Sequence, residues 1–289
     1  EGFTVYFERR IMENIYGSSY AEMLAALGYQ DLVETVEDLE ASGKGEDTRL
    51  KLNLTGRDPD EGVSDIAYEK GYFFLRSLEK IVGRENFDKF LNKYFSENAF
   101  KSIDTEKFIA YINQNLLQKD KINVDPEFIS RWIYTMGLPH DLEAVTSQRF
   151  QNVNSEIQKF RQEMDASELN TKDWSSHEWL YFVRNLQADL TLEHMEALDK
   201  NFNLTNSGNA EILTAWFLHV IGQGYTPGYP QLEKFLTTVG RRKFLVPLYK
   251  ELAKTPEGLS IAMDTYKKAR PNYHYVSINT LDELLDYKP

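Results

Sequence analysis

The five histidines of the chain are scattered singly, and none forms the pair that a zinc peptidase needs. They are His140, His177, His194, His219 and His274. Zinc peptidases place two imidazoles at positions i and i+4 of one helix, with a glutamate between them, because residues four apart share a helical face. The nearest approach is HEWLY at 177–181, in which Tyr181 occupies the position of the second histidine. We therefore expect His177 to be an ordinary first-turn or capping residue of a helix.

Nucleophile and nucleotide-binding motifs are also missing from the sequence. The chain has no cysteine and no G-x-S-x-G stretch, so neither a Cys nor a Ser nucleophile stands out. Its 16 glycines follow neither the P-loop spacing nor the dinucleotide-binding spacing. Spacing alone therefore indicates an acidic, mainly helical protein without an assigned activity.

Six further polar residues could act in a site, and several of them also have an ordinary structural interpretation. The six are Glu1, Glu8, Asp60, Tyr68, Arg241 and Lys243. Glu8 follows Glu1 by seven residues, so their carboxylates project from one helical face, although Glu8 is equally typical of a solvated surface. Asp60 is typical of turn chemistry, and Tyr68 of a core tyrosine at the start of a helix. Cations at a helix N-terminus, as in GRRKF, are electrostatically unfavourable, which favours a functional reason for them.

The first half of the chain is predicted to be helical, with one irregular stretch. Apolar residues recur at helical spacing from Phe3 to Ile15, and helix is expected to about residue 30, followed by an acidic helix or loop. RLKLNL at 49–54 alternates like a short strand, and 55–65 is predicted to be a loop because glycine and proline interrupt it. Residues 66–81, 85–95 and 104–116 are predicted helices, the last capped by Asp104.

The second half is predicted to be a succession of short helices. We place them at about 153–164, 176–188, 192–201, 208–222, 229–239, 241–254 and 257–270, with Ser176 and Thr191 as N-caps. Short helices joined by short turns, without a strand pattern, favour helical pairs stacked in an armadillo-like or HEAT-like superhelix. WIYTMGLPHDLEAV, with its glycine and proline after an aromatic cluster, indicates a domain boundary near 137–150.

Composition excludes several classes of partner. The net charge of −12 disfavours nucleic acid, which is bound by clustered lysine and arginine. No apolar run approaches the roughly 20 residues of a membrane-spanning helix, so no membrane span is expected. The absence of cysteine suits a reducing compartment such as the cytoplasm, and it is also compatible with a bacterial periplasm.

Four stretches carry a resemblance to a known family. EGFTVYFERR at 1–10 resembles the N-E-G-x-x-x-Y-x-E segment of gluzincin aminopeptidases, peptidase family M1. DPDEGVSDIAYEKG at 58–71, WIYTMGLP at 132–139 and GRRKFLVPLYKEL at 240–252 are similar to motifs of its leukotriene A4 hydrolase and aminopeptidase B branch. The resemblance implies the C-terminal part of a thermolysin-like catalytic domain at 1–137, a linker at 138–152 and an α-superhelical domain at 153–289.

The resemblance implies a role for each of the six polar residues. Glu1 matches the third zinc ligand, and Glu8 a carboxylate that orients a zinc-bound histidine. Tyr68 matches the tyrosine that stabilises the oxyanion of the tetrahedral intermediate. Asp60 matches a loop aspartate that holds the N-terminus of the peptide, which implies some preference for basic N-terminal residues. Arg241 and Lys243 match the cations that bind a substrate carboxylate, whereas Arg242 is assigned to the surface.

The resemblance also implies what is missing. The chain looks like a C-terminal fragment that begins at the third zinc ligand, so H-E-x-x-H would lie upstream, and the chain alone is expected to be inactive and without a stable zinc site. Val63 and Ala67 depart from the hydrolase pattern, so aminopeptidase activity on short peptides is expected and epoxide hydrolysis is not. A fragment should expose an apolar patch within residues 1–75, where the rest of the protein would pack. The alternative is a non-catalytic helical scaffold that binds a peptide.

Overall fold

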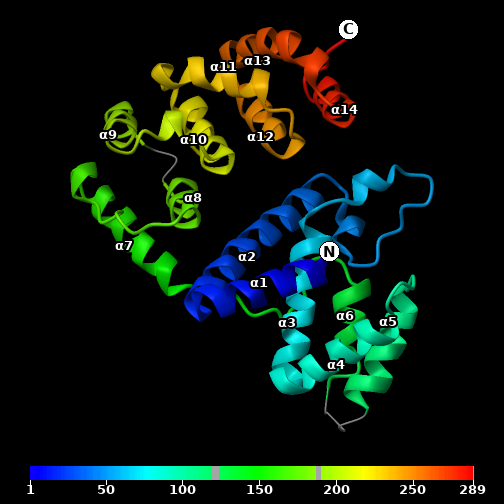
Figure 1. Cartoon of the computed structure of the whole chain (residues 1–289). Helices are drawn as coiled ribbons and strands as arrows, with labels where there is room; N and C mark the ends of the chain where they lie inside the picture. Colours follow the sequence, from blue (N-terminus) through cyan, green and yellow to red (C-terminus); the bar gives the residue numbers. More distant parts are fainter. Residues whose placement is uncertain (119–123, 187–189, 289) are drawn as a thin grey trace. The chain divides into compact units, whose positions relative to one another are not determined.

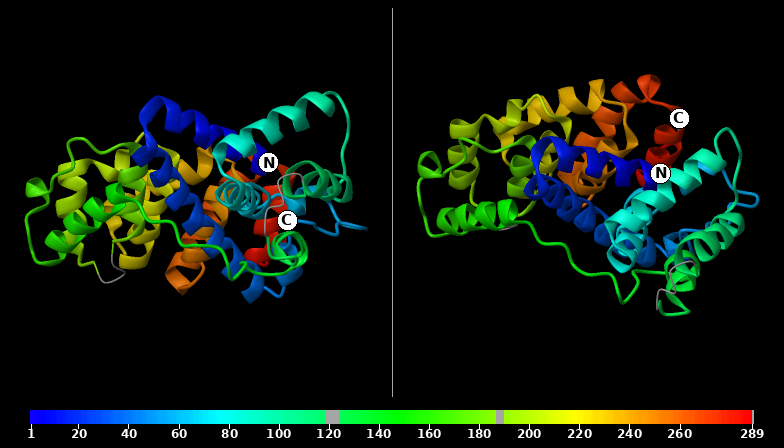
Figure 2. Two further views of the ribbon diagram at one scale, coloured as in Figure 1. Left: turned by 90° about the horizontal axis from the view of Figure 1, so that it is seen from below. Right: turned by 60° about the horizontal axis from the view of Figure 1, so that its bottom comes forward.

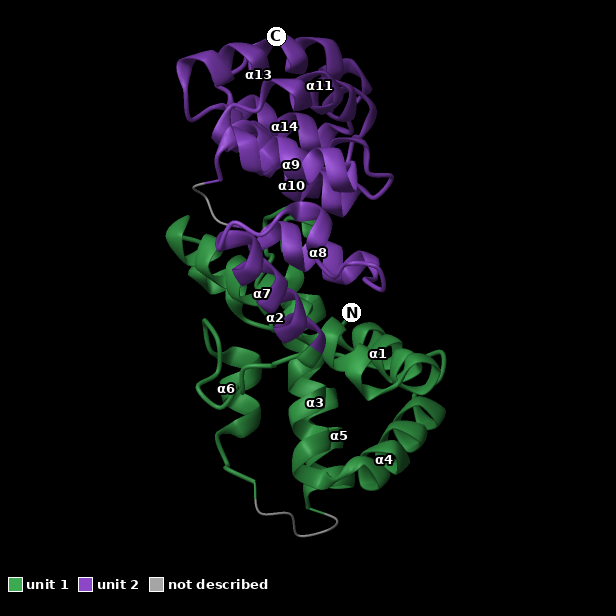
Figure 3. Ribbon diagram, turned by 90° about the vertical axis from the view of Figure 1, so that its left-hand side faces the viewer, with its two compact units in different colours: residues 1–148 green, residues 149–289 purple. Residues whose placement is uncertain are grey.

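Every regular element in residues 1–118, 124–186 and 190–288, the residues that the structure describes, is a helix (Figure 1). The computed structural model divides into two units, Glu1–Gln148 and Arg149–Pro289, and each is described by itself (Figure 3). The mainly α fold class predicted from the sequence is therefore confirmed. Within the described ranges, no helix has the length and apolarity that a membrane crossing requires.

In residues 1–118 and 124–148 the first unit has six α-helices and several short turns of other helix types. The α-helices are α1 (Gly2–Tyr16), α2 (Ser18–Ala41), α3 (Gly71–Val82), α4 (Arg84–Glu97), α5 (Thr105–Ile112) and α6 (Phe128–Tyr134). The 3₁₀ turns η1 (Gly45–Thr48) and η2 (Pro59–Gly62) lie in the irregular stretch, and η3 (Ile66–Lys70) and η4 (Asn113–Leu117) are π-helices. The predicted cap of α5 is confirmed, because the Asp104 carboxylate accepts a hydrogen bond from the Lys107 amide at 2.8 Å.

The core of this unit lies where α1, α2 and α3 pack together. α1 contacts α2, α3 and η3, and α3 also contacts α4. The largest side chains that these contacts bury include Tyr6, Leu32, Phe73, Phe87 and Trp132. Because apolar residues recur every three or four positions along these helices, each helix presents one apolar face to this cluster.

The short strand predicted at 49–54 is wrong. This stretch is irregular, and its Lys51 amide donates to the Ile133 carbonyl, in a different segment, at 3.1 Å. A strand needs a partner strand along a ladder of such bonds, and the described residues offer helices only. The side chains of Leu52 and Leu54 instead pack against Gly62 of η2.

The described part of the second unit, without residues 187–189 and 289, has eight α-helices. They are α7 (Gln148–Arg161), α8 (Ser176–Arg184), α9 (Leu192–Phe202), α10 (Ala210–Gln223), α11 (Tyr229–Thr238), α12 (Arg242–Leu252), α13 (Pro256–Ala269) and α14 (Tyr275–Leu284). The short 3₁₀ turns η5 to η8 lie between them. The start of α7 falls inside the predicted linker at 138–152, as does the division at 148, and the domain bounds remain predictions.

Successive helices of this unit pack on near neighbours in the sequence. α10 contacts α8, α11 and α12, while α13 contacts α11 and α12, and α14 contacts α12. Figure 2 shows the yellow, orange and red helices of this unit beside one another in both views. Thr191 caps α9 as predicted, by accepting a hydrogen bond from the His194 amide. The predicted cap Ser176 is wrong by one residue, because Glu178 completes a capping box with Ser175. His177 lies in the first turn of α8, as expected.

Candidate active site

The start of α1, where Glu1 lies, packs directly against the start of α3. A Cβ atom added to Gly2 would lie 2.6 Å from the carbonyl carbon of Gly71, and one added to Gly71 would lie 3.0 Å from the Cα of Gly2. Only glycine allows two backbones to approach so closely. Glu1 directly precedes Gly2, and Tyr68 lies on the π-helix that leads into Gly71. The glycine contact therefore brings the predicted zinc ligand and the predicted oxyanion donor to the same region of the unit.

Tyr68 occupies the middle of the π-helix η3 (Ile66–Lys70). π-Helices are rare, and single turns of this kind are frequent at functional sites because the wider turn redirects a side chain. Tyr68 is half-buried, and its hydroxyl has no hydrogen-bond partner among the described residues. Glu69 and Lys70, which follow it, are both fully engaged. The phenol O–H of Tyr68 is thus available to a ligand while its neighbours hold the backbone.

Glu69 forms a buried ion pair with Arg9 of α1. Nη2 of Arg9 donates to both carboxylate oxygens of Glu69, at 2.9 and 2.8 Å, and the two side chains are 7% and 13% exposed. Burial raises the pKa of Glu69, and the Arg9 charge opposes that shift. The Arg9 guanidinium also lies over the Tyr72 ring, 4.0 Å from its centroid. This pair ties the helix that begins after Glu1 to the turn that carries Tyr68.

Lys70 is completely buried and binds three backbone carbonyls. Its ammonium donates to the carbonyl oxygens of Thr48 at 2.7 Å, Thr135 at 3.1 Å and Gly137 at 2.8 Å. Burial lowers the pKa of Lys70 to about 8, and the nearby Arg49 charge adds to the effect. The ammonium therefore anchors η3 to η1, which contains Thr48, and to the segment after α6, which contains Thr135 and Gly137.

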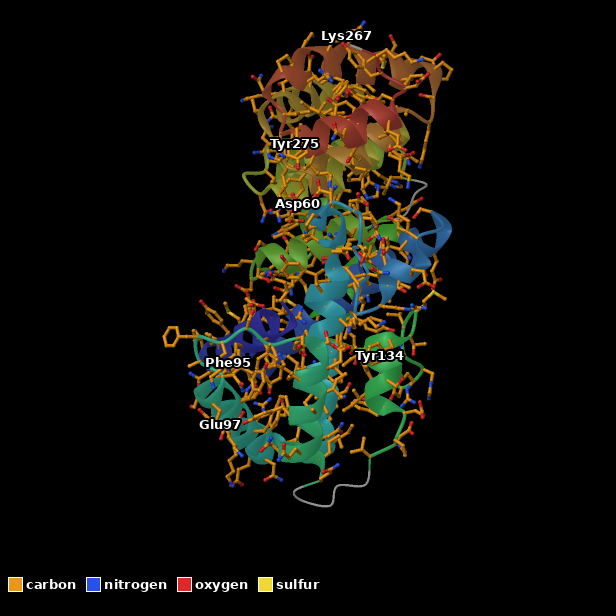
Figure 4. All side chains as sticks on the ribbon, turned by 90° about the vertical axis from the view of Figure 1, so that its right-hand side faces the viewer. Asp60, Phe95, Glu97, Tyr134, Lys267 and Tyr275 are labelled. Atoms are coloured by element: carbon orange, nitrogen blue, oxygen red, sulfur yellow. The ribbon has the colours of Figure 1, made fainter. Side chains whose placement is uncertain are left out.

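Asp60 lies on the η2 turn, in the predicted loop (Figure 4). The turn is held by Asp58, whose carboxylate accepts a hydrogen bond from the Asp60 amide at 3.0 Å, and by Arg57, which forms two 2.7 Å bonds to Asp47. Arg57 lowers the pKa of Asp47 and also pairs with Glu61. Asp60 is exposed, and within the described ranges its own carboxylate has no partner, so this carboxylate is free to bind a cation.

Glu1 directly precedes α1 and Glu8 lies on it. Both carboxylates are exposed, and neither has an ion-pair partner among residues 1–118, 124–186 and 190–288. Within these same residues, no three His, Cys, Asp or Glu side chains gather in a way that could hold a metal. Catalytic zinc takes three protein ligands, and a carboxylate such as that of Glu1 is one of the donors that such a site uses.

Arg241 and Lys243 lie at the start of α12 in the second unit. Arg241 occupies the N-cap position, where its guanidinium lies 5.7 Å from the ring centroid of Phe244. Lys243 forms an exposed ion pair of 3.1 Å with Glu211 of α10. The first turn of α12 contains no acidic residue that would offset these charges against the helix dipole. Arg242, assigned to the surface, is half-buried.

Sequence reasoning gave no separate role to Arg9, Lys70, Gly2 or Gly71. Lys70 did leave a signal, since it and Glu69 interrupt the otherwise apolar run that leads into Tyr72 and the phenylalanines after it. A charged residue on a buried helical face needs partners, and those partners come from distant segments.

An apolar stripe runs along the outer face of α1. Phe7, Ile11 and Ile15 follow one another at four-residue spacing and are 38%, 55% and 60% exposed. Phe95 of α4 lies beside the stripe, with its ring centroid 5.5 Å from that of Phe7 (Figure 4). The apolar patch expected within residues 1–75 is therefore present.

Comparisons with known proteins show what the chain is similar to. Residues 1–132 match the sequence profile described as the Peptidase family M1 domain, and residues 174–285 match that of Leukotriene A4 hydrolase, C-terminal. The "Leucine aminopeptidase 2" of Chaetomium globosum is 33% identical over 286 residues, which are 95% of this chain and 46% of that protein. The "Leukotriene A-4 hydrolase homolog" of Botryotinia fuckeliana is 30% identical, with 95% and 43% covered.

A solved structure extends the likeness to the fold. The yeast LTA4 hydrolase in complex with bestatin matches with a TM-score of 0.84 and 28% identity, over 99% of this chain and 49% of that one. The chain thus spans a little under half the length of the curated relatives that it matches. The two profiles cover both units, and the chain belongs to peptidase family M1, with a C-terminal domain of the leukotriene A4 hydrolase type.

Proposed function

We propose that the intact protein is a zinc-dependent aminopeptidase that removes N-terminal residues from short peptides. The observation that carries the proposal is Tyr68, a phenol without a partner among the described residues, in a π-helix whose next two residues, Glu69 and Lys70, are bonded to distant segments. The names of the relatives, leucine aminopeptidase 2 above all, support the reaction class. The departures at Val63 and Ala67 weigh against epoxide hydrolysis.

Tyr68 would act on the developing oxyanion. When water attacks a peptide carbonyl, negative charge grows on the carbonyl oxygen, and a fixed O–H donor stabilises that charge more than it stabilises the substrate. A donor already engaged by another protein group would first have to break that bond. Tyr68 has no such bond to break within the described residues, which suits it for the role.

Glu1 would supply one carboxylate ligand of the zinc, with Glu8 on the same helical face to orient a histidine ligand. The remaining ligands would come from residues outside this chain, so the chain alone is proposed to be inactive. When bound, zinc lowers the pKa of its water and polarises a carbonyl. The exposed stripe of Phe7, Ile11 and Ile15 is the surface on which the rest of the protein would pack.

Asp60 would hold the free amino group of the peptide. Its exposed carboxylate stands on a turn fixed by Asp58 and Arg57, so it is presented to ligands without being tied to a cation. A carboxylate in this position attracts a positively charged N-terminal residue as well as the amino group itself. We therefore propose a preference for arginine or lysine at the peptide N-terminus.

Removing the cations of α12 should weaken binding more than turnover. In the Arg241→Ala/Lys243→Ala variant of the intact protein, we expect KM for a tripeptide to rise about 10- to 100-fold, since a hydrogen-bonded charge contact contributes about 1.5–3 kcal/mol. An aminoacyl anilide, which has no terminal carboxylate, should keep its kcat/KM. Steady-state kinetics on both substrates measures the difference, and equal losses on both would contradict the assignment.

The function itself is tested by activity and metal content together. We expect the intact protein to hydrolyse arginine or alanine anilide, to lose activity after treatment with a chelator and to regain it with about one zinc per chain. The chain of residues 1–289 alone should show neither activity nor bound zinc. An intact protein that folds, binds zinc and hydrolyses none of a panel of peptides and anilides would leave a helical peptide-binding scaffold as the better assignment.

A further inference from the structure

The Arg9 to Glu69 pair lies where α1, α2 and η3 meet. A Cβ atom on Gly28 of α2 would lie 2.2 Å from a Glu69 oxygen and 2.3 Å from Nη2 of Arg9, so the glycine leaves the space that the pair fills. The Tyr72 ring covers the guanidinium from another side. The pair is therefore enclosed by residues of four elements, α1, α2, η3 and α3.

Two contacts separated along α1 fix the helix against η3 and the start of α3, which follows η3 directly. The backbone contact of Gly2 with Gly71 sets the separation at one end, and Arg9 meets Glu69 seven residues further along, about 10 Å away on a helix. One contact would leave α1 free to rotate about its axis. Two contacts fix both its distance and its rotation, and with them the direction in which Glu1 and Glu8 project relative to Tyr68.

Stability alone does not explain this pair. Nε and Nη1 of Arg9 are buried, and neither has a hydrogen-bond partner among the described residues. A buried ion pair with unmet donors gains little over apolar side chains of similar volume, and such replacements are often neutral or stabilising. The geometric role is the explanation that remains.

We propose that Arg9, through Glu69, is a positioning residue that orients the Tyr68 turn toward the helix of Glu1. The proposal rests on the proposed aminopeptidase function, because it assigns Arg9 a part in that same site. Arg9 touches no reacting atom. It acts by fixing the position of η3 against α1.

The decisive variant replaces both partners in the intact protein. In Arg9→Met/Glu69→Met no charge is left buried, so we expect the Tm to return close to the wild-type value, whereas Arg9→Met alone should be clearly destabilised. If the pair positions Tyr68, kcat in the double variant falls about tenfold or more while KM stays within about twofold. A wild-type kcat in the double variant would overturn the proposal.

The matched control is the pair between Arg76 and Glu22, which joins α3 to α2 at 2.9 Å and, within the described residues, has no hydrogen bond to η3 or to the start of α1. Arg76 also donates to the hydroxyl of Tyr72 at 3.1 Å, so the control removes that contact as well and leaves the Arg9 to Glu69 pair in place. Arg76→Met/Glu22→Met should leave kcat unchanged, and an equal fall there would show a general effect of lost ion pairs. Hydrogen exchange separates positioning from function. We expect the amides of residues 66–70 to exchange about tenfold faster in Arg9→Met/Glu69→Met and not in the control.

This exchange readout decides the positioning role even if the wild-type protein shows no aminopeptidase activity, in which case the proposed function alone fails. Unchanged exchange in residues 66–70 of the double variant would overturn the positioning role.

Discussion

Replacing Tyr68 by Phe in the intact protein is expected to lower kcat for peptide hydrolysis about 10²- to 10³-fold, with KM changed by less than about threefold. The substitution removes one O–H donor and keeps the ring. Because that donor acts on charge that develops only in the transition state, its loss falls on turnover and not on substrate binding. Steady-state kinetics with alanine anilide and with a tripeptide measures both constants.

The stability of Tyr68→Phe should be that of the wild type, because the hydroxyl makes no hydrogen bond within the described residues. Tyr29→Phe is the matched control, since Tyr29 is also half-buried in the first unit and its hydroxyl also has no partner there. We expect the control to keep full activity. Full activity of Tyr68→Phe, or an equal loss in both variants, would remove the oxyanion role from Tyr68.

Local periodicity predicted most helices, because burying one apolar face is what forms each of them. It failed where a distant or competing partner decides the structure. RLKLNL alternates as a strand does, yet the described residues offer it no strand to pair with. Ser176 is as good a capping residue as Ser175, and only the reach of Glu178 back to the Ser175 amide selects between them.

The candidate site was less accessible to sequence reasoning than the fold. Spacing left Tyr68 as an ordinary core tyrosine, and only the resemblance of the Y-E-K-G stretch to the family singled it out. The approach of Gly2 to Gly71 and the partners of Lys70 join segments about 20 to 70 residues apart, which no local pattern reports. Non-local contacts of this kind explain why the roles of the residues around Tyr68 emerged only from the structure.

Replacing Lys70 by Met should cause the largest loss of stability of the changes considered. Met keeps the apolar stem but leaves the carbonyls of Thr48, Thr135 and Gly137 buried without their donor. An unsatisfied buried polar group costs about 1–3 kcal/mol, so we expect a total loss of about 3–5 kcal/mol after partial relaxation, or roughly 10 °C in Tm. Thermal and urea unfolding of the first unit measure it.

The stability difference between wild type and Lys70→Met should widen as the pH rises from 8 to 10. Burial lowers the pKa of Lys70 to about 8 in the folded protein, whereas an unfolded lysine titrates at about 10.4. Between these values the unfolded state binds more protons than the native state, so this residue makes the free energy of unfolding rise with pH. Below about pH 8 both states are protonated and the slope vanishes. Urea unfolding of both proteins at pH 7, 8, 9 and 10 measures the difference between their free energies of unfolding.

Lys80→Met tests whether the effect of Lys70 depends on burial. Lys80 also lies in the first unit, on α3, but its ion pair with Glu143 is exposed, with the two side chains 52% and 77% accessible. Water replaces such a partner at little cost, so we expect hardly any change in Tm. Equal losses in the two variants would mean that the loss of a positive charge destabilises the unit, and not the loss of the hydrogen-bond donor to three buried carbonyls.

A Lys70→Met protein as stable as the wild type would show that η3 is held in place without this anchor, and that Arg9 and Gly2 alone fix the turn that carries Tyr68.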